Sequence, residues 1–265
     1  FTINKALPTI TVTGGTFAYD GSVHPASAQA TGIGGSTVSG SFSYTYNGLP
    51  AEPISVGNYA VVANFTSSDP NYTNATGNGS IVITPGSQMI TFGALPDKTF
   101  DDPPFNVSAT ASSTLAVSFA SQTPLTCSIS GNIVTILDVG VCTIRASQAG
   151  DSNYNGAAPV DQSLNVTPGA LHHFAIGAIN SPQTAGQAFS ISITAQDKGN
   201  HTVTSFSGTV EITSTGILSS GAGTSEPFIN GVLTSHSVTI LNTGTFTITA
   251  TRTGGTESGT SNSFT

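Results

Sequence analysis

The sequence predicts an all-β fold built from three β-sandwiches in tandem. Ser and Thr account for 35 and 40 of the 265 residues, and they alternate with apolar side chains over short stretches. Alternation with a period of two is typical of half-buried strands, which Thr, Val and Ile favour. The 30 Gly and 14 Pro supply the turns that many short strands need. Hydrophobic residues make up 37% of the chain, enough for folded cores.

One strand pattern occurs three times and predicts the number of sandwiches. Each copy reads Gly-x-(Tyr/Cys/Phe)-x-(Val/Ile)-x-Ala, and the copies begin at Gly57, Gly140 and Gly244. These starts are 83 and 104 residues apart, close to the roughly 100 residues of a seven-stranded sandwich. Alternate side chains of a strand share a face, so three residues of each copy are expected in the core. These residues are Tyr59, Val61 and Ala63; Cys142, Ile144 and Ala146; and Phe246, Ile248 and Ala250.

Two short Thr-Pro-Gly segments mark the expected domain boundaries. They follow closing strands that we expect at residues 79–83 and 162–166. Pro removes a strand donor and Gly permits a change of direction. Because the junctions are short, we expect a rod-like array. The expected parts are the end of a preceding repeat at residues 1–6 and domains at residues 7–85, 86–168 and 169–265.

Further strands are expected where apolar and polar residues alternate between turn signals, and no helix is expected. These strands cover residues 7–12, 41–46, 105–109, 116–120, 133–137, 189–195, 209–214 and 237–241. Both ends of the chain look like parts of a closing strand, at residues 1–6 and 261–265. Two interpretations follow. The chain is a fragment of one long protein, or it is a repeating subunit whose terminal strand completes a neighbour's sheet.

The sparse charge argues against several partners. Lys and Arg total 5 against 13 Asp and Glu, for a net charge of −8. Five cations cannot form a stripe that follows phosphates, so no nucleic-acid partner is expected. No apolar run approaches the roughly 18–20 residues of a membrane span, so no membrane insertion is expected in this segment. The chain opens on Phe1 without Met or a signal sequence, so we expect a mature protein or a fragment.

The two cysteines, Cys127 and Cys142, lie 15 residues apart within one expected domain. A disulfide between them would suit a secreted protein, and no His or Cys cluster favours a metal site instead. The alternative is a pair of buried free thiols.

No set of residues has the spacing of a catalytic site, so we expect no enzyme activity and no cofactor. The adjacent His172 and His173 would face opposite sides of a strand and could bind metal only with partners from elsewhere. The weak calcium candidates are Asp101 and Asp102, which are adjacent, and Asp197. Calcium takes six to eight oxygen ligands, usually from several carboxylates, and the densest group here supplies only two.

Seven Asn-x-Ser/Thr motifs occur, and four of them cluster in the first expected domain. In a secreted protein such motifs are candidate glycosylation sites on the surface. The clustered asparagines are Asn64, Asn71, Asn74 and Asn78.

Each expected domain resembles a recurrent bacterial module. Residues 7–84 resemble the MBG-type bacterial Ig-like module, in Phe17-Ala18-Tyr19-Asp20-Gly21 and Asp69-Pro70-Asn71-Tyr72. Residues 88–166 resemble a Cys-containing bacterial Ig-like repeat, in the segments around both cysteines. Residues 170–265 resemble an invasin- or filamin-type Ig-like module, in Ile193-Thr194-Ala195-Gln196-Asp197 and Phe206-Ser207-Gly208-Thr209-Val210.

These resemblances imply immunoglobulin-like sandwiches from large secreted bacterial proteins such as adhesins, stalks and surface fibres. We therefore expect an extracellular structural spacer, stalk or fibre-forming segment at the bacterial cell surface. Its expected partners are neighbouring Ig-like domains of the same chain or identical subunits in a fibre. One alternative is an adhesin module whose loops bind a glycan or a host or cell-surface protein. Another is the repeating subunit of a filament assembled by strand complementation.

Overall fold

The computed structural model describes residues 2–265 and confirms the predicted all-β fold. Its regular structure consists of strands and one short 3-10 turn, Ile33–Gly35. Within residues 2–265 there is no α-helix, and hence no apolar helix of membrane-spanning length. Phe1, the first residue of the segment 1–6 that is expected to end a preceding repeat, lies outside the described residues.

The sheets fall into three successive sets along the sequence. Strands within residues 9–84 form sheets with one another, as do strands within residues 90–167 and within residues 173–260. The packing of the described chain divides it differently, into two compact units whose border runs through the middle set. The first unit holds the chain up to Thr91 with residues 109–118 and 146–160, and the second holds the rest. The three domain ranges expected from the sequence therefore stay a prediction.

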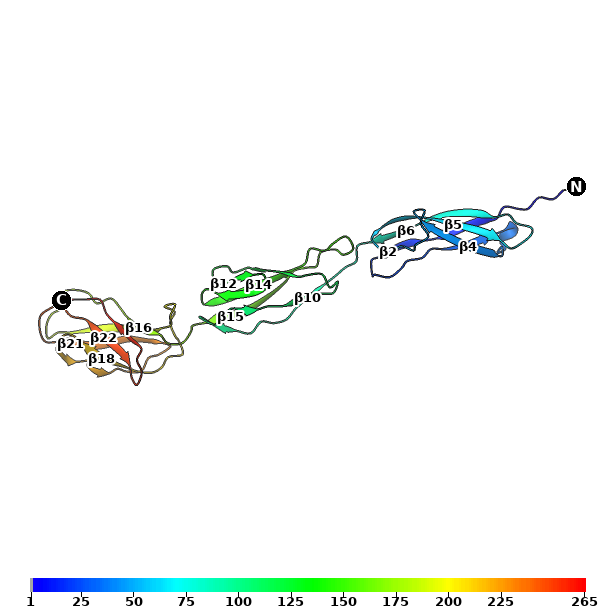
Figure 1. Ribbon diagram of the computed structural model, residues 1–265. Helices are drawn as coiled ribbons and strands as arrows, with labels where there is room; N and C mark the ends of the chain where they lie inside the picture. Colours follow the sequence, from blue (N-terminus) through cyan, green and yellow to red (C-terminus); the bar gives the residue numbers. More distant parts are fainter. Residues whose placement is uncertain (1) are drawn as a thin grey trace. The chain divides into compact units, whose positions relative to one another are not determined.

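The first sandwich packs a two-stranded sheet, β1-β3, against a four-stranded sheet of order β2-β6-β5-β4 (Figure 1). Its long strands β5 and β6 are antiparallel and carry most of the core, including Val61, Phe65 and Ile81. Since alternate residues of these strands are apolar, one face of the sheet is buried. The strands are β1 Thr9–Thr13, β2 Gly15–Ala18, β3 Ser27–Thr31, β4 Gly40–Tyr46, β5 Gly57–Ser67 and β6 Ala75–Thr84.

The middle sandwich has sheets of order β10-β7, β11-β14-β15-β8 and β12-β13-β9 (Figure 1). Its fully buried residues include Val134 in β13 and Ile144 in β14. The closing strand β15 pairs in parallel with the short strand β8. The strands are β7 Ile90–Phe92, β8 Lys98–Thr99, β9 Phe105–Asn106, β10 Ala109–Ala111, β11 Ser118–Ser121, β12 Cys127–Ser130, β13 Ile133–Ile136, β14 Gly140–Ser147 and β15 Val160–Thr167.

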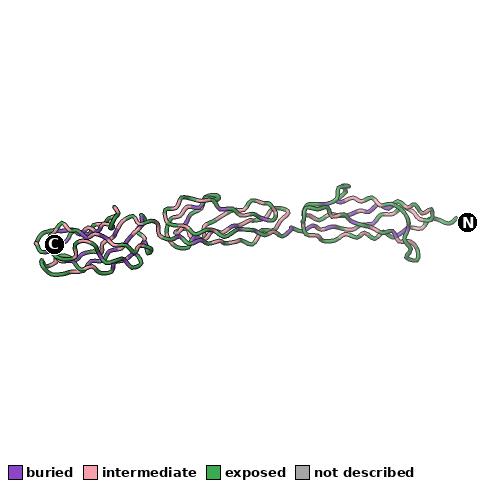
Figure 2. Tube along the Cα trace, turned by 90° about the horizontal axis from the view of Figure 1, so that it is seen from below, coloured by how far each residue is buried: buried purple, intermediate pink, exposed green. Residues whose placement is uncertain are grey.

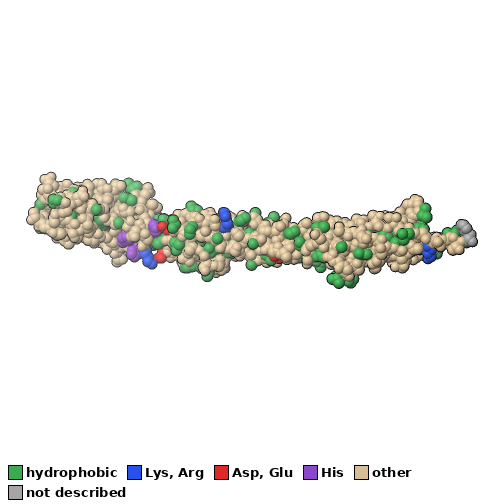
Figure 3. Space-filling view, turned by 90° about the horizontal axis from the view of Figure 1, so that it is seen from above, with side chains coloured by type: hydrophobic (Ala, Val, Ile, Leu, Met, Phe, Trp, Pro, Cys, Tyr) green, Lys and Arg blue, Asp and Glu red, His purple; other side chains and the backbone are tan. Residues whose placement is uncertain are grey.

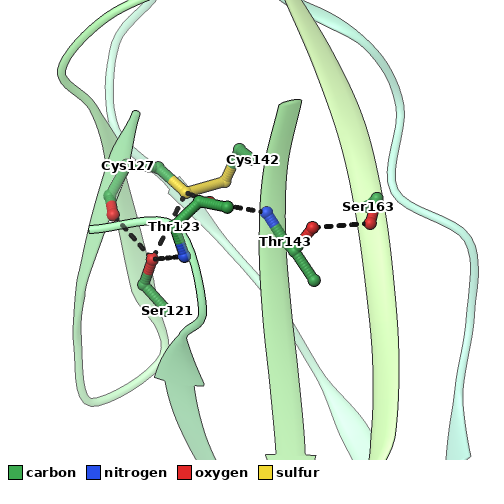
Figure 4. The surroundings of a disulfide bond; sticks show 6 residues. All are labelled: Ser121, Thr123, Cys127, Cys142, Thr143 and Ser163. Carbon is green, nitrogen blue, oxygen red and sulfur yellow. Dashed lines mark hydrogen bonds between the residues drawn. A yellow bond between two sulfur atoms is a disulfide. The ribbon is translucent and has the colours of Figure 1, made fainter. Parts of the chain in front are cut away.

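A disulfide joins Cys127, at the start of β12, to Cys142 in β14, and both residues are 0% exposed. Hydroxyl side chains of Ser121 and Thr123, which precede Cys127, form hydrogen bonds next to the disulfide (Figure 4). The Ser121 hydroxyl donates to the Cys127 carbonyl at 2.8 Å. The Thr143 N–H donates to the Thr123 hydroxyl at 2.9 Å. The covalent bond and these hydrogen bonds therefore hold the start of β12 against β14.

The third sandwich packs a sheet of order β16-β17-β21-β19 on one of order β20-β18-β22-β23 (Figure 1). Its core is a single cluster that includes Phe174, Ile193, Ile212 and Phe228. The strands are β16 His173–Ile176, β17 Ala188–Gln196, β18 Val210–Ser214, β19 Leu218–Ser220, β20 Gly223–Thr224, β21 Val232–Ile240, β22 Ile248–Arg252 and β23 Ser258–Thr260.

The repeated strand pattern lies on β5, β14 and β22 with its inward residues at most 9% exposed, apart from the half-buried Tyr59. Buried and exposed residues alternate along the traces in Figure 2. The leading Gly140 and Gly244 adopt φ values of +121° and +152°, which favour glycine. The third copy differs from the expected seven-residue strand, because regular pairing begins only at Ile248 and Phe246 forms an isolated bridge with Phe264.

Several expected strands differ from the observed ones. The strand expected at residues 105–109 is interrupted at Val107 and Ser108, because its two ends join different sheets as β9 and β10. The strand expected at residues 237–241 instead belongs to the longer β21, which begins at Val232. Its N-terminal half contains the consecutive polar residues 234–237, which hide the period-two pattern.

Replacing Ile81 with Ala should destabilise the first sandwich by about 2–5 kcal/mol, because Ile81 is 0% exposed and the change leaves a cavity. Five of the six tyrosines lie within residues 19–72, so tyrosine fluorescence in a urea titration reports on this sandwich. Leu49→Ala is the matched control, since Leu49 is 65% exposed, and should change stability by less than about 0.5 kcal/mol. Equal effects of the two substitutions would contradict the assigned core.

Removing the disulfide with Cys127→Ala and Cys142→Ala together should destabilise the middle sandwich by about 3 kcal/mol, because the bond closes a loop of 15 residues. Hydrogen exchange of the β14 amides measures the loss, and reductant should reproduce it in the natural chain but leave the double variant unchanged. Mass spectrometry after alkylation should find no labelled thiol before reduction and two afterwards. Two labels before reduction would establish free thiols.

Candidate functional site

Where the chain enters the middle sandwich at Gly86, it pairs with a loop at residues 151–155, which we call the second entry loop. Within the first compact unit, Gly86 pairs in parallel with Tyr154. The Gly86 N–H donates to the Asn153 carbonyl at 2.8 Å, and the Asn155 N–H donates to the Gly86 carbonyl at 2.9 Å. The Asp151 carboxylate accepts the N–H groups of Asn153 and Tyr154 at 2.8 Å each, and so fixes the loop.

The preceding sandwich also contacts the second entry loop. The Tyr19 ring packs edge-on against the Tyr154 ring, with centroids 5.1 Å apart. The Val56 N–H donates to the Asn153 side-chain carbonyl at 3.3 Å. A side chain added at Gly86 would collide with the Tyr19 carbonyl. The second entry loop therefore contacts both Gly86, at the junction, and residues of the first sandwich.

Residues 69–73, the first entry loop, hold Ala6 in the same manner. Ala6 pairs in parallel with Tyr72. The Ala6 N–H donates to the Asn71 carbonyl at 2.8 Å, and the Thr73 N–H donates to the Ala6 carbonyl at 2.9 Å. The Asp69 carboxylate again accepts the N–H of the asparagine two residues later, at 2.8 Å. Ala6 in the first sandwich is thus equivalent to Gly86 in the middle one.

A second polar cluster, in the second compact unit, centres on His201. His201 Nε2 lies 2.6 Å from Asp138 Oδ1, and His201 Nδ1 lies 3.0 Å from both carboxylate oxygens of Asp197. The Phe100 ring meets the imidazole edge-on at 4.6 Å between centroids. Figure 3 shows one face of the chain, on which charged side chains are few and several gather with histidines in one place.

Asp197 is 1% exposed, so its charge must be compensated by nearby donors. Its carboxylate accepts the N–H groups of Gly169, Gly199 and His201 at 2.8–2.9 Å. Burial alone would raise the pKa of Asp197, but these hydrogen bonds outweigh it and lower the pKa below its ordinary value. For His201 burial acts to lower the pKa, and hydrogen bonds to Asp197 and Asp138 outweigh it and raise the pKa. Both shifts favour a charged His201 between two carboxylates.

The three calcium candidates line one hollow of about 310 Å³, but each carboxylate already has partners within the protein. Asp101 lies 3.4 Å from the Lys198 ammonium. Asp102 accepts the Thr99 N–H at 3.0 Å and the Thr99 hydroxyl at 2.9 Å, and the N–H bond chiefly lowers its pKa. Asp197 belongs to the His201 cluster. Across residues 2–265, no group of three or more His, Cys, Asp or Glu side chains is placed to hold a metal ion.

The other site candidates are dispersed. All four clustered asparagines are exposed, and Asn74 accepts the Ser67 N–H at 3.0 Å through its side chain. Their glycosylation stays a prediction. His172 and His173 contact each other, with their Nδ1 atoms 3.2 Å apart.

Sequence reasoning missed the role of His201. The Asp197-Lys198-Gly199-Asn200 turn was recognisable, and His201 follows it directly. Asp138, however, lies 63 residues away and carries no local signal of this contact. The Asp-x-Asn-Tyr motif at residues 69–72 and 151–154 is a turn signal in the sequence, but it does not indicate which residues the loops hold.

Comparison with known proteins agrees with the resemblance predicted for the first domain, because residues 8–87 match the family model of the MBG domain. Similar solved structures include the D00-D0 domain of intimin, at 13% identity and TM-score 0.41, covering 66% of this chain and 97% of that one. Domains 1–6 of the surface layer protein SbsC match at 16% identity and TM-score 0.30, covering 99% and 41%. Mouse protocadherin-24 EC1-3 matches at 14% identity and TM-score 0.37, covering 100% and 97%. No curated protein sequence matches the chain.

Replacing His201 with Gln should destabilise the third sandwich most between about pH 4 and 6.5. The raised pKa of His201 stabilises the fold below about pH 6.5, and this contribution is lost as the pH rises through the folded value. The lowered pKa of Asp197 stabilises the fold above about pH 4 and is lost as the pH falls through the folded value. Thermal unfolding across this pH range, followed by hydrogen exchange of β17, measures the difference from the natural chain.

His236→Gln is the control for replacing a histidine, since His236 instead contacts the Gly221 carbonyl at 2.9 Å. A stability difference for His201→Gln that is constant from pH 4 to 9, or equal to that of the control, would contradict the charged cluster.

Proposed function

We propose that this chain is a non-catalytic structural spacer within a multidomain protein at the bacterial cell surface. The observation that carries the proposal is the repeated entry-loop geometry, in which Ala6 pairs with Tyr72 as Gly86 pairs with Tyr154. A tandem array needs such a repeated device, because each sandwich must hold the chain that arrives from the one before. The rod-like arrangement, the three domain limits and the extracellular location belong to this proposal.

The disulfide of the middle sandwich supports the proposed extracellular location. The disulfide between Cys127 and Cys142 would persist outside the cell. The match of residues 8–87 to the MBG domain supports a module of a bacterial surface protein. The chain's partners in this proposal are neighbouring Ig-like domains of the same polypeptide.

A binding role through loops is the second candidate, and one observation favours it. Residues 47–56 form a long loop of the first sandwich, on which Leu49 is 65% and Ile54 is 42% exposed. The loop lines a hollow of about 320 Å³ together with Tyr46 and Tyr59. Exposed apolar and aromatic groups around a hollow can bind a glycan or a protein surface.

Binding of the labelled chain to a glycan array and to immobilised host surface proteins separates the two roles. The spacer proposal predicts no saturable binding, with the chain unchanged by Leu49→Ala and Ile54→Ala. Saturable binding that these two substitutions weaken at least tenfold would establish the adhesin role instead. Glu226→Ala, in the third sandwich, is the control for a substitution distant in sequence from this loop.

A further inference from the structure

Strand β4 of the first sandwich has a strand partner on only one of its two sides. It ends the sheet of order β2-β6-β5-β4 and pairs along its length with β5 (Figure 1). β4 has seven residues, whereas every other strand at the end of a sheet within residues 2–265 has at most five. An open strand edge offers a row of main-chain donors and acceptors to another chain. In the described part of the chain, β4 therefore offers the longest such row.

Two hydrogen bonds at the ends of the β4–β5 ladder show which main-chain groups face away from β5. At one end, the Ser68 N–H donates to the Ser39 carbonyl at 3.0 Å. At the other end, the Asn47 N–H donates to the Ala60 carbonyl at 2.8 Å. Residues that bond to the partner strand alternate with residues whose main-chain groups point the opposite way. The odd-numbered residues of β4 therefore bond to β5, and the even-numbered ones direct their main-chain groups to the open side.

Three of these even-numbered residues have free main-chain groups. Tyr46 is satisfied within its own turn, because it exchanges hydrogen bonds with Leu49 at 2.7 and 3.0 Å. The N–H and C=O groups of Gly40, Phe42 and Tyr44 have no hydrogen-bond partner among residues 2–265. A strand added beside β4 would satisfy all of them.

β4 lacks the features that usually protect a sheet edge from another strand. Those features are charged side chains, Pro and bulges. No Asp, Glu, Lys or Arg lies between Asp20 and Glu52, β4 contains no Pro, and its register with β5 is unbroken. On the solvent face of the sheet, Ser41 and Ser43 are exposed, small and uncharged. Although the whole chain carries a net charge of −8, a second copy of β4 therefore meets no like charge along this edge.

β4 is also complementary to a second copy of itself. When two copies pair antiparallel with Phe42 opposite Phe42, Gly40 of each copy lies opposite Tyr44 of the other. Every free main-chain group is then used, because each of these facing pairs exchanges two hydrogen bonds. The half-buried rings of Phe42 and Tyr44, with centroids 6.1 Å apart, lie at this edge on the core face of the sheet. Phe42 then packs against its counterpart, and Tyr44 covers the glycine, which has no side chain to compete for the space.

We propose that β4 is a pairing edge for β4 of a second copy of this chain, so that the two four-stranded sheets join into one. The contact has two-fold symmetry, since the same residues contribute from both copies. We expect a weak dimer, because contact through one strand edge is smaller than the roughly 1,200–2,000 Å² of stable interfaces. This inference goes beyond the spacer role, since it joins separate chains rather than domains of one chain.

The first test combines sedimentation with hydrogen exchange of the full chain. Sedimentation equilibrium should show a reversible dimer with a Kd between about 10 μM and 1 mM. The amides of Phe42 and Tyr44 should exchange at least about twofold more slowly at 1 mM chain than at 10 μM. The Ser43 amide, which bonds to β5, is the internal control and should not change. A chain that is monomeric at every concentration, or Phe42 and Tyr44 amides whose exchange is independent of concentration, would overturn the proposal.

The second test changes the charge of the edge. Ser41 faces Ser43 of the other copy in this register, so Ser41→Lys with Ser43→Lys brings like charges together and should weaken the dimer at least tenfold. Ser41→Glu with Ser43→Glu should do the same, and an equimolar mixture of the two double variants should restore the dimer. Thr76→Lys with Ser80→Lys is the control, because it adds the same charge on exposed positions of the inner strand β6 and should leave the dimer intact.

A dimer that the β4 lysines leave unchanged, or that the β6 lysines weaken equally, would overturn the assignment to β4. A mixture of the lysine and glutamate variants that stays monomeric would overturn the pairing of β4 with itself. Both tests measure contact between copies of the chain. Their failure is therefore distinguishable from failure of the spacer role, which glycan and protein binding decide.

Discussion

Main-chain pairing between the repeated strand and the closing strand is the interaction on which the rest of the structure depends. In the first sandwich β5 and β6 pair from Gly57↔Ile83 to Phe65↔Ala75, and the inward residues of both strands form the core. In the middle sandwich β14 lies beside β15, and the disulfide anchors β14. The closing strand also delivers the chain to the junction. The pairing of the repeated strand with the closing strand therefore completes the core and also places the end of the closing strand before the junction.

Hydrogen bonds between uncharged groups, rather than ion pairs, hold most of the polar structure together. Asp and Glu total only 13 in 265 residues, and neutral side chains such as those of Ser121, Thr123 and Asn74 hydrogen-bond backbone groups instead. Asp197 is an exception, because it is a buried carboxylate that accepts three backbone N–H groups and contacts His201. A buried charge is tolerated only when it is paired and hydrogen-bonded, and His201 supplies the counter-charge. The shifted pKa values of this cluster predict a pH-dependent stability for the second compact unit, whereas the entry loops hold Ala6 and Gly86 through main-chain hydrogen bonds.

Local regularities were predictable from the sequence, and long-range contacts were not. Alternation placed Val61, Ile144 and Ile248 on inward faces, and each is at most 1% exposed. The third copy of the strand pattern was only partly regular, because Gly244 and Phe246 precede β22 and the pairing with Phe264 is isolated. The contacts of Gly86 with residues 153–155 and of His201 with Asp138 join segments more than 60 residues apart. No periodic pattern encodes such contacts, since they depend on how finished sandwiches and loops meet.

Single-molecule extension of the chain from its two ends tests the central claim, that three sandwiches are each closed by their own last strand. The account predicts three separate unfolding steps. Reductant should lengthen one of them by about 50 Å, because the loop of 15 residues between Cys127 and Cys142 then extends at about 3.3–3.6 Å per residue. A single cooperative step, or a number of steps other than three, would contradict the account.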